Sequence, residues 1–107
     1  MTYRVRVVVD RGAEADLLRL YDFMLERAQY LEDLEVAHRA LDVIQSAIAH
    51  SLAMTPFLFR RAPTGGPLRR ELVIPFGSAG FVVQYEVASP SLVVVLAVRH
   101  QREQEWN

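Results

Sequence analysis

Hydrophobic positions along the chain repeat with two periods, one typical of strands and one of helices. Residues 3–9 alternate between polar and β-branched positions, which predicts a first β-strand. Residues 13–31 and 34–54 each carry one continuous apolar face at helical spacing, which predicts two helices. We expect Asp33 to be the N-cap of the second helix and Pro56 to follow its end. Because the link between the helices is short, they should form an antiparallel hairpin.

Three more strands are predicted in the second half of the chain, over residues 68–74, 81–87 and 92–98. The turns between them are short enough for hairpins. The element order is therefore β-α-α-β-β-β, within a single domain of residues 1–107. This order predicts an α+β fold, with the helical hairpin packed on one face of a mainly antiparallel four-stranded sheet.

Alternation along the predicted strands divides their side chains between two faces of the sheet. One face is almost wholly apolar, so the helical hairpin should cover it. The other mixes valines with arginines and acids, whereas an antiparallel sheet face left in water should be mainly polar. This valine patch predicts a binding surface for another polypeptide, unless the tail that contains Trp106 folds back over it. The contact residues expected on it are Val73, Val82, Gln84, Val93, Val95 and Arg99.

Composition excludes several classes of function. The chain has no cysteine, which excludes disulfides, thiolate metal sites and cysteine nucleophiles, and its three histidines lack the spacing of metal ligands. All twelve basic residues are arginine, so no lysine can act as a general base or phosphate ligand. No apolar run approaches the ~20 residues of a membrane span, and the N-terminal residues lack the apolar stretch of a signal peptide. We therefore expect a cytoplasmic protein without metal or cofactor.

Charge is unevenly placed, although the net charge is only −1. Residues 1–55 hold six arginines and nine acids, and residues 56–107 hold six arginines and four acids, so an anion is expected to meet the C-terminal half. Arg69, His100 and Arg102 are candidates for phosphate chemistry, because histidine titrates near neutral pH and arginine binds phosphate oxygens. The alternative is that the arginines form a solvated rim and the histidine bonds a backbone carbonyl.

Two aromatic residues of the hairpin, Phe23 and Tyr30, lie one heptad apart and outside the apolar face of the first helix. They form a candidate second contact patch, for a dimer or for a target; the alternative is that they are ordinary exposed aromatics. The acids of the two helices, Asp16 among them, are expected on a solvated face.

Four segments resemble the RelE/ParE toxin superfamily: Ala-Asp-Leu-Leu-Arg-Leu-Tyr-Asp-Phe (15–23), Arg-Glu-Leu-Val-Ile-Pro-Phe-Gly (70–77), Phe-Val-Val-Gln-Tyr-Glu-Val (81–87) and Val-Val-Val-Leu-Ala-Val-Arg-His-Gln-Arg-Glu (93–103). The resemblance implies a bacterial toxin of a type II toxin–antitoxin pair, of the plasmid-stabilisation type, which arrests growth. It also implies a cognate antitoxin that wraps the toxin. Operator DNA would be bound only through that antitoxin, and no membrane is involved.

The superfamily divides by target: RelE-like members cut mRNA on the ribosome, and ParE-like members inhibit DNA gyrase. Nucleases of this group often carry an arginine where Val82 follows Gly80-Phe81, and a neutral valine cannot stabilise a phosphorane. The resemblance therefore favours a non-enzymatic gyrase inhibitor. Its expected target contacts are Arg99, Arg102 and Trp106. The alternatives are a ribosome-dependent mRNA endonuclease, with the catalytic residues Arg69, His100 and Arg102, and an inactive member that only binds its antitoxin.

Overall fold

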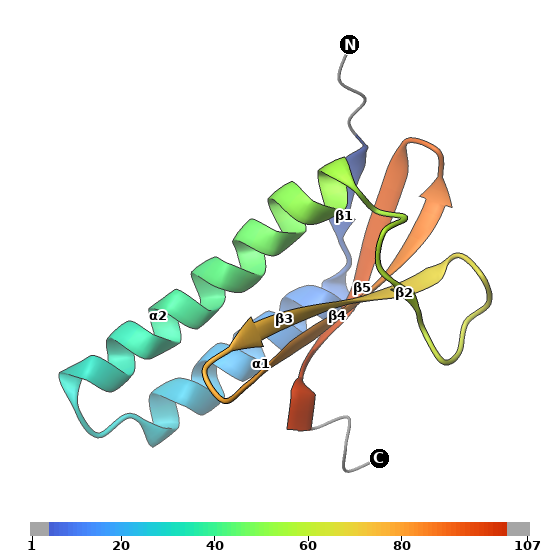
Figure 1. Cartoon of the computed structure of the whole chain (residues 1–107). Helices are drawn as coiled ribbons and strands as arrows, with labels where there is room; N and C mark the ends of the chain where they lie inside the picture. The colour runs from blue at the N-terminus through green and yellow to red at the C-terminus, as the bar shows by residue number, and fades with distance from the viewer. Residues whose placement is uncertain (1–4, 103–107) are drawn as a thin grey trace.

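The structure is a computed structural model that describes residues 5–102 of the chain. It has two layers, a sheet and a helical hairpin that covers one of its faces (Figure 1). In chain order the elements are β1 (Arg6–Val9), α1 (Arg11–Arg27), α2 (Leu31–Ser46), the π-helical η1 (Ala47–Leu52), β2 (Arg60–Arg61), β3 (Arg69–Phe76), β4 (Ala79–Ser89) and β5 (Leu92–His100).

The strands form one sheet in the order β1-β5-β4-β3-β2. β1 pairs with β5 in parallel, and the other neighbouring strands pair antiparallel. The expected α+β class, with a helical hairpin on one face of a mainly antiparallel sheet, is confirmed. The sheet has five strands instead of four because Arg60 and Arg61, expected in a loop, pair with Glu71 and Arg70 at its edge.

The second helix begins earlier than expected. α2 starts at Leu31 with Tyr30 at its N-cap, so the prediction that Asp33 is the N-cap is wrong. The Asp33 carboxylate instead reaches back from the first turn and accepts hydrogen bonds from the backbone N–H groups of Gln29 (2.9 Å) and Tyr30 (3.1 Å). The Asp33 carboxylate thus accepts hydrogen bonds from backbone N–H groups that have no partner within the helix, and its negative charge interacts favourably with the positive end of the helix dipole. The helix continues through η1 and, as expected, ends before Pro56.

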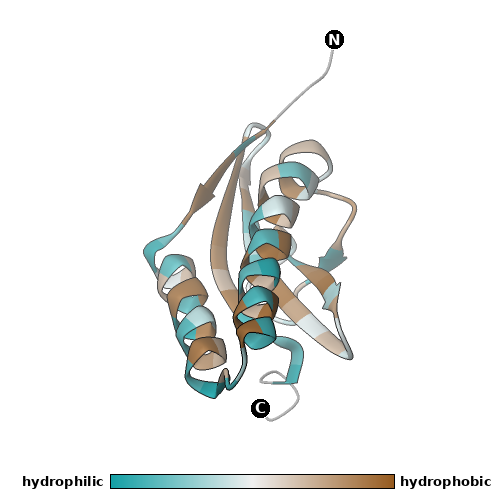
Figure 2. Cartoon of the chain, turned by 90° about the vertical axis from the view of Figure 1, so that its left-hand side faces the viewer, coloured by the Kyte–Doolittle hydropathy of each residue, from teal (hydrophilic) through white to brown (hydrophobic). Residues whose placement is uncertain are grey.

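The core lies between the hairpin and the inner face of the sheet (Figure 2). Hydrophobic and hydrophilic stretches alternate along both helices in Figure 2, as expected of helices that bury one side. Burying a large aliphatic or aromatic side chain contributes roughly 1.5–3 kcal/mol, so this face of the sheet stabilises the fold and is closed to partners. Its fully buried large members are Ile44, Leu52, Val83, Tyr85, Val93, Val95 and Val98.

β5 does not keep one alternation along its length. Its pairing with β4 skips a residue between Val95 and Ala97, so Leu96 is an extra residue in the strand. Such a β-bulge exchanges the two faces for the residues on one side of it. Val93 and Val95 therefore point toward the helices and are fully buried, and the prediction that they line the outer face is wrong. Val94 and Leu96, half-buried, take the outer positions instead.

The edge of β5 is open beyond Val95, where its pairing with the shorter β1 ends. At this edge the backbone N–H of Val98 donates to the Asp16 carboxylate of α1 at 2.9 Å. A buried N–H without a partner would cost about 1–3 kcal/mol, so the carboxylate takes the place of a neighbouring strand. Asp16 is therefore not simply part of a solvated face, as expected from its sequence position, but joins α1 to the sheet.

Tyr85 joins the loop after η1 to the centre of the sheet. Its side chain is fully buried, and its hydroxyl donates to the backbone carbonyl of Pro56 at 2.5 Å. Burial raises the pKa of Tyr85 to about 12, because the ionised phenolate would lose its hydration; the nearby charge of Arg70 lowers the pKa by a smaller amount. The folded protein therefore holds this proton more tightly than the unfolded chain.

Stability should consequently fall at alkaline pH in a way that depends on Tyr85. Between pH 10 and 12 the unfolded tyrosine loses its proton while the folded one keeps it, so we expect the free energy of unfolding to drop by roughly 1–3 kcal/mol. Tyr85→Phe should remove this drop and should cost about 1–3 kcal/mol at pH 8, because the Pro56 carbonyl loses its donor. Urea titrations of both proteins at several pH values measure both effects; identical pH profiles would contradict the prediction.

Candidate functional site

The outer face of the sheet brings together four of the six residues expected to bind a polypeptide. Val73 pairs with Val82 across β3 and β4, and Val82 pairs with Arg99 across β4 and β5. Gln84 lies two residues further along β4, on the same face. Because of the bulge at Leu96, the side chains of the other two, Val93 and Val95, lie on the inner face. Val82 is only 1% exposed, so the apolar part of the predicted contact surface is reduced to the half-buried Val73, and that surface is narrower and more polar than the sequence suggested.

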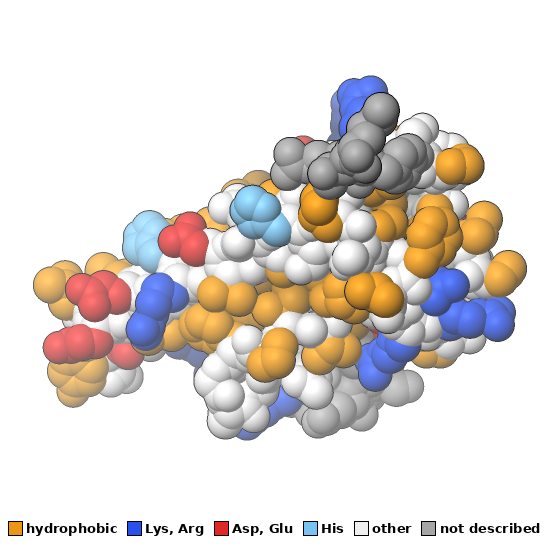
Figure 3. All heavy atoms as spheres, turned by 45° about the horizontal axis from the view of Figure 1, so that its top comes forward, with side chains coloured by type: hydrophobic (Ala, Val, Ile, Leu, Met, Phe, Trp, Pro, Cys, Tyr) orange, Lys and Arg blue, Asp and Glu red, His pale blue; other side chains and the backbone are white. Residues whose placement is uncertain are grey.

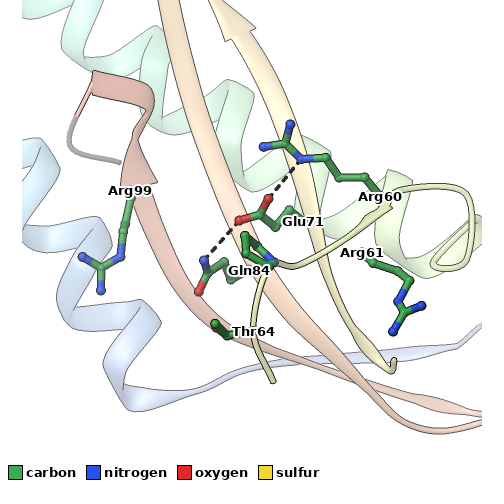
Figure 4. Close-up of a pocket in the computed structure, with 7 residues that line it drawn as sticks. Arg60, Arg61, Thr64, Glu71, Gln84 and Arg99 are labelled. Atoms are coloured by element: carbon green, nitrogen blue, oxygen red, sulfur yellow. Dashed lines mark hydrogen bonds and ion pairs between the residues drawn. The ribbon is translucent and has the colours of Figure 1, made fainter. Parts of the chain in front are cut away.

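A pocket of about 810 Å³ opens on this face (Figure 4). Its lining carries three arginines and one glutamate, which gives a formal charge of +2. Arg99 reaches it from β5, while two arginines come from β2 on the other side of the glutamate. Such an arrangement suits an acidic side chain or another anion, because guanidinium groups bind carboxylates in a fixed geometry. The lining residues are Arg60, Arg61, Pro63, Thr64, Glu71, Gln84 and Arg99.

Glu71 organises the floor of the pocket. Its side chain is only 3% exposed, and each carboxylate oxygen accepts one hydrogen bond: from Arg60 Nε at 3.0 Å and from Gln84 Nε2 at 3.2 Å. A buried carboxylate needs such partners to offset its lost hydration. Because the ion pair uses Nε, the two terminal nitrogens of the half-exposed Arg60 remain outside it. Glu71 thus fixes an arginine and an amide at the pocket without neutralising Arg61 or Arg99.

Glu71 and the Arg60 ion pair were not among the predicted site residues. The only signal in the sequence is that Glu71 shares the outer face with Gln84 by strand alternation. The residues opposite it depend on the pairing of three strands, and β2 is too short to recognise from its two arginines. Neither the burial of Glu71 nor its ion pair with Arg60 could therefore be predicted from the sequence.

The three residues considered for RNA cleavage are not assembled. Arg69 pairs with Glu86, and His100 pairs with Phe81. The two residues are therefore offset by five positions along β4, which is about 17 Å at the usual rise of a strand. Arg69 lies on the outer face. The His100 ring instead meets the ring of Phe81 edge-on, at 5.7 Å between centroids, and Phe81 belongs to the core beneath the helices.

Arg69 and His100 each have local surroundings of their own. The side chain of Arg69 lies so close to Gly65, a residue with φ of +94°, that a Cβ on Gly65 would overlap it. The buried Nε of Arg69 has no hydrogen-bond partner among residues 5–102. His100 Nδ1 accepts a hydrogen bond from the backbone N–H of Arg102 at 3.1 Å. Of the three predicted target contacts, Arg99 is exposed in β5, Arg102 is exposed just beyond the end of that strand, and Trp106 lies outside the described residues.

Within residues 5–102, no three histidine or acidic side chains are arranged to hold a metal ion. No helix in that range combines the length and apolar character that a bilayer crossing requires.

Comparison with known proteins agrees with the resemblance seen in the sequence. Toxin RelE3 of Caulobacter vibrioides is 38% identical over 91 residues, which cover 85% of this chain and 88% of the relative. Toxin RelE1 of the same organism is 34% identical over 104 residues, 97% and 99% of the two chains. A solved structure described as a chromosomal ParDE TA system from P. aeruginosa has the same fold, with a TM-score of 0.69, 20% identity and coverage of 92% and 98%. Residues 7–105 match the family model described as the ParE toxin of the type II toxin–antitoxin system parDE, so the chain belongs to this family of toxins.

Proposed function

We propose that this toxin arrests growth by inhibiting DNA gyrase, without cutting RNA, and that its cognate antitoxin neutralises it by binding across the outer face of the sheet. Membership of the ParE family supports the gyrase target. The observation that favours a non-enzymatic mechanism is the separation of Arg69 from His100, about 17 Å apart and on opposite faces of the sheet. A nuclease needs its acid, base and cations within hydrogen-bond reach of one phosphate.

The antitoxin proposal rests on the chemistry of the outer face. The pocket beside Val73 and Val82 has a formal charge of +2 and two arginines outside the Glu71 ion pair. An antitoxin segment with an acidic side chain above the pocket and an apolar side chain over the half-buried Val73 matches this surface. The toxin would then bind operator DNA only through the antitoxin.

The target is tested by expressing the toxin without its cognate antitoxin, which we expect to be the protein encoded by a short adjacent reading frame. We expect growth arrest, and we expect the purified toxin to inhibit supercoiling by purified gyrase while mRNA on ribosomes stays intact. His100→Ala should arrest growth as the wild type does. Ribosomal mRNA cleavage that disappears in His100→Ala would assign the nuclease function instead, and healthy growth with abundant folded protein would identify an inactive member.

The antitoxin contact is tested at Arg61 and Arg99, which line the pocket outside the Glu71 ion pair. We expect the double variant Arg61→Gln, Arg99→Gln to bind the protein from the adjacent reading frame at least tenfold more weakly, because charge-assisted hydrogen bonds are lost. Titration calorimetry at two salt concentrations measures the Kd and should show a weaker salt dependence in the variant. Arg39→Gln, an exposed arginine on α2, is the matched control. An unchanged Kd in the double variant would contradict the antitoxin proposal.

A further inference from the structure

The closed end of the helical hairpin carries exposed apolar side chains that the core does not use. Tyr30 is the N-cap of α2, Leu31 and Leu34 belong to its first turn, and Phe23 lies near the C-terminal end of α1. We call these four residues the hairpin tip. Their exposed fractions are 68%, 75%, 38% and 50%, respectively. The helical spacing of three residues places Leu34 beside Leu31. Phe23 and Tyr30 are the aromatics that the sequence singled out as a second contact patch.

The tip is held in shape before any partner binds. The Arg27 guanidinium lies 4.3 Å from the centre of the Phe23 ring. The Asp33 carboxylate fixes the turn through two backbone N–H groups. Farther from the tip, the Tyr21 hydroxyl of α1 forms a hydrogen bond with Nε2 of His38 in α2, at 3.2 Å, which joins the two helices. A pre-ordered surface loses little conformational entropy on binding, so exposed aromatic and leucine side chains on it make effective anchors.

Charge around the tip is strongly negative. Residues 22–35 contain five acids and one arginine, a formal charge of −4, against −1 for the whole chain. Apolar side chains (orange) and acidic side chains (red) lie together at the left-hand end of Figure 3, which is the closed end of the hairpin. A nucleic acid or an anionic lipid surface would be repelled, and a second copy bound tip to tip would bring like charges together. The complementary occupant is a protein surface in which arginine or lysine residues surround an apolar depression.

We propose that the hairpin tip is the surface through which the toxin docks on a basic, nucleic-acid-binding surface of its target protein. The arginine pocket lies on the sheet face that the helices leave uncovered, so the acidic hairpin tip and the proposed antitoxin surface are separate and differ in the sign of their charge. This inference rests on the proposed function in that DNA gyrase, as a DNA-binding enzyme, offers such a basic surface. It adds a second contact to the one expected at Arg99 and Arg102.

The test is the double variant Phe23→Ala, Leu31→Ala, with Met54→Ala, Leu58→Ala as a control of similar exposure elsewhere on the molecule. Both changes are on exposed side chains, so circular dichroism and urea midpoints should stay close to those of the wild type. We expect the tip variant to need at least tenfold more protein for half-inhibition of supercoiling and to lose growth arrest. Its Kd for the protein from the adjacent reading frame should stay within twofold of the wild-type value.

Each other outcome decides between the inference and the proposed function. Growth arrest and gyrase inhibition that persist in the tip variant would overturn the inference and leave the gyrase proposal standing. A parallel loss of antitoxin affinity would place the tip in the antitoxin interface and also overturn it. If the wild type does not inhibit gyrase, but the tip variant alone loses growth arrest with antitoxin binding intact, the docking surface stands and the gyrase target fails. A wild-type chain that causes no growth arrest overturns both.

Discussion

Replacing Val95 by arginine should leave the protein unfolded, whereas the same replacement at Val94 should be tolerated. Val95 has no exposed surface and packs in the core between the sheet and the helices, so a guanidinium there would be desolvated and unpaired. A buried charge without a partner costs several kcal/mol, which is comparable with the whole stability of a small domain, about 5–15 kcal/mol. Val94 is half-buried on the outer face and lies opposite Glu86, which an arginine can pair with.

The two variants differ by one position in the same strand, so they test the bulge at Leu96 directly. Circular dichroism and the urea midpoint are the measurements, and we expect Val94→Arg to stay within about 1 kcal/mol of the wild type. A strand without the bulge would reverse the result, with Val94→Arg unfolded and Val95→Arg stable. That reversal would also return Val93 and Val95 to the surface proposed for the antitoxin.

Gly80→Ala should produce the second large loss of stability, at least about 3 kcal/mol. Gly80 is buried opposite Pro75 in the β3–β4 pair, and a methyl group there would overlap the carbonyl oxygen of Ile74 and lie 3.2 Å from Pro75 Cα. Both neighbours are backbone atoms, so neither can move without disturbing the pairing of the strands. Overpacking of this kind ordinarily costs about 1–3 kcal/mol when flexible side chains can yield, and more when they cannot.

Gly77→Ala is the matched control, three residues earlier in the same hairpin. A Cβ at Gly77 meets no atom within 4 Å, but the residue has φ of +61°, so alanine should cost about 1–2 kcal/mol through backbone strain alone. Urea midpoints of both variants separate the steric effect from the conformational one. Equal losses in the two variants would mean that the close approach of β3 and β4 at Gly80 is not what requires glycine.

These variants also bear on function, because the β3–β4–β5 pairing builds the proposed antitoxin surface. The same strands hold Val73, Val82 and Arg99 side by side and bring Gln84 to Glu71. A slip of one residue in any of them would move a charged side chain into the core and a valine into water. We therefore expect variants that weaken the pairing to lose antitoxin binding and stability together, unlike Arg61→Gln and Arg99→Gln.

Local patterns were sufficient for the elements and for the family. Hydrophobic spacing predicted both helices and four of the five strands, because burial on one side imposes a period on each element separately. The resemblance to RelE/ParE toxins rested on whole segments and is confirmed by the match over residues 7–105. The exposure of Phe23 also followed from position alone, since the surface of a helix is fixed by its own residues; Tyr30 is exposed as well, but at the N-cap between the two helices and not on the first helix.

The pairing between distant strands decided everything that alternation left open. One extra residue, Leu96, turned Val93 and Val95 from the expected binding face into the core. Glu71 became the buried centre of the pocket only because β2 and β4 place Arg60 and Gln84 beside it. The amino-acid sequence thus determined which residues are strand, helix, apolar or charged. Which of them meet was decided by the tertiary structure, because register and bulges minimise the free energy of the whole sheet and not of any single strand.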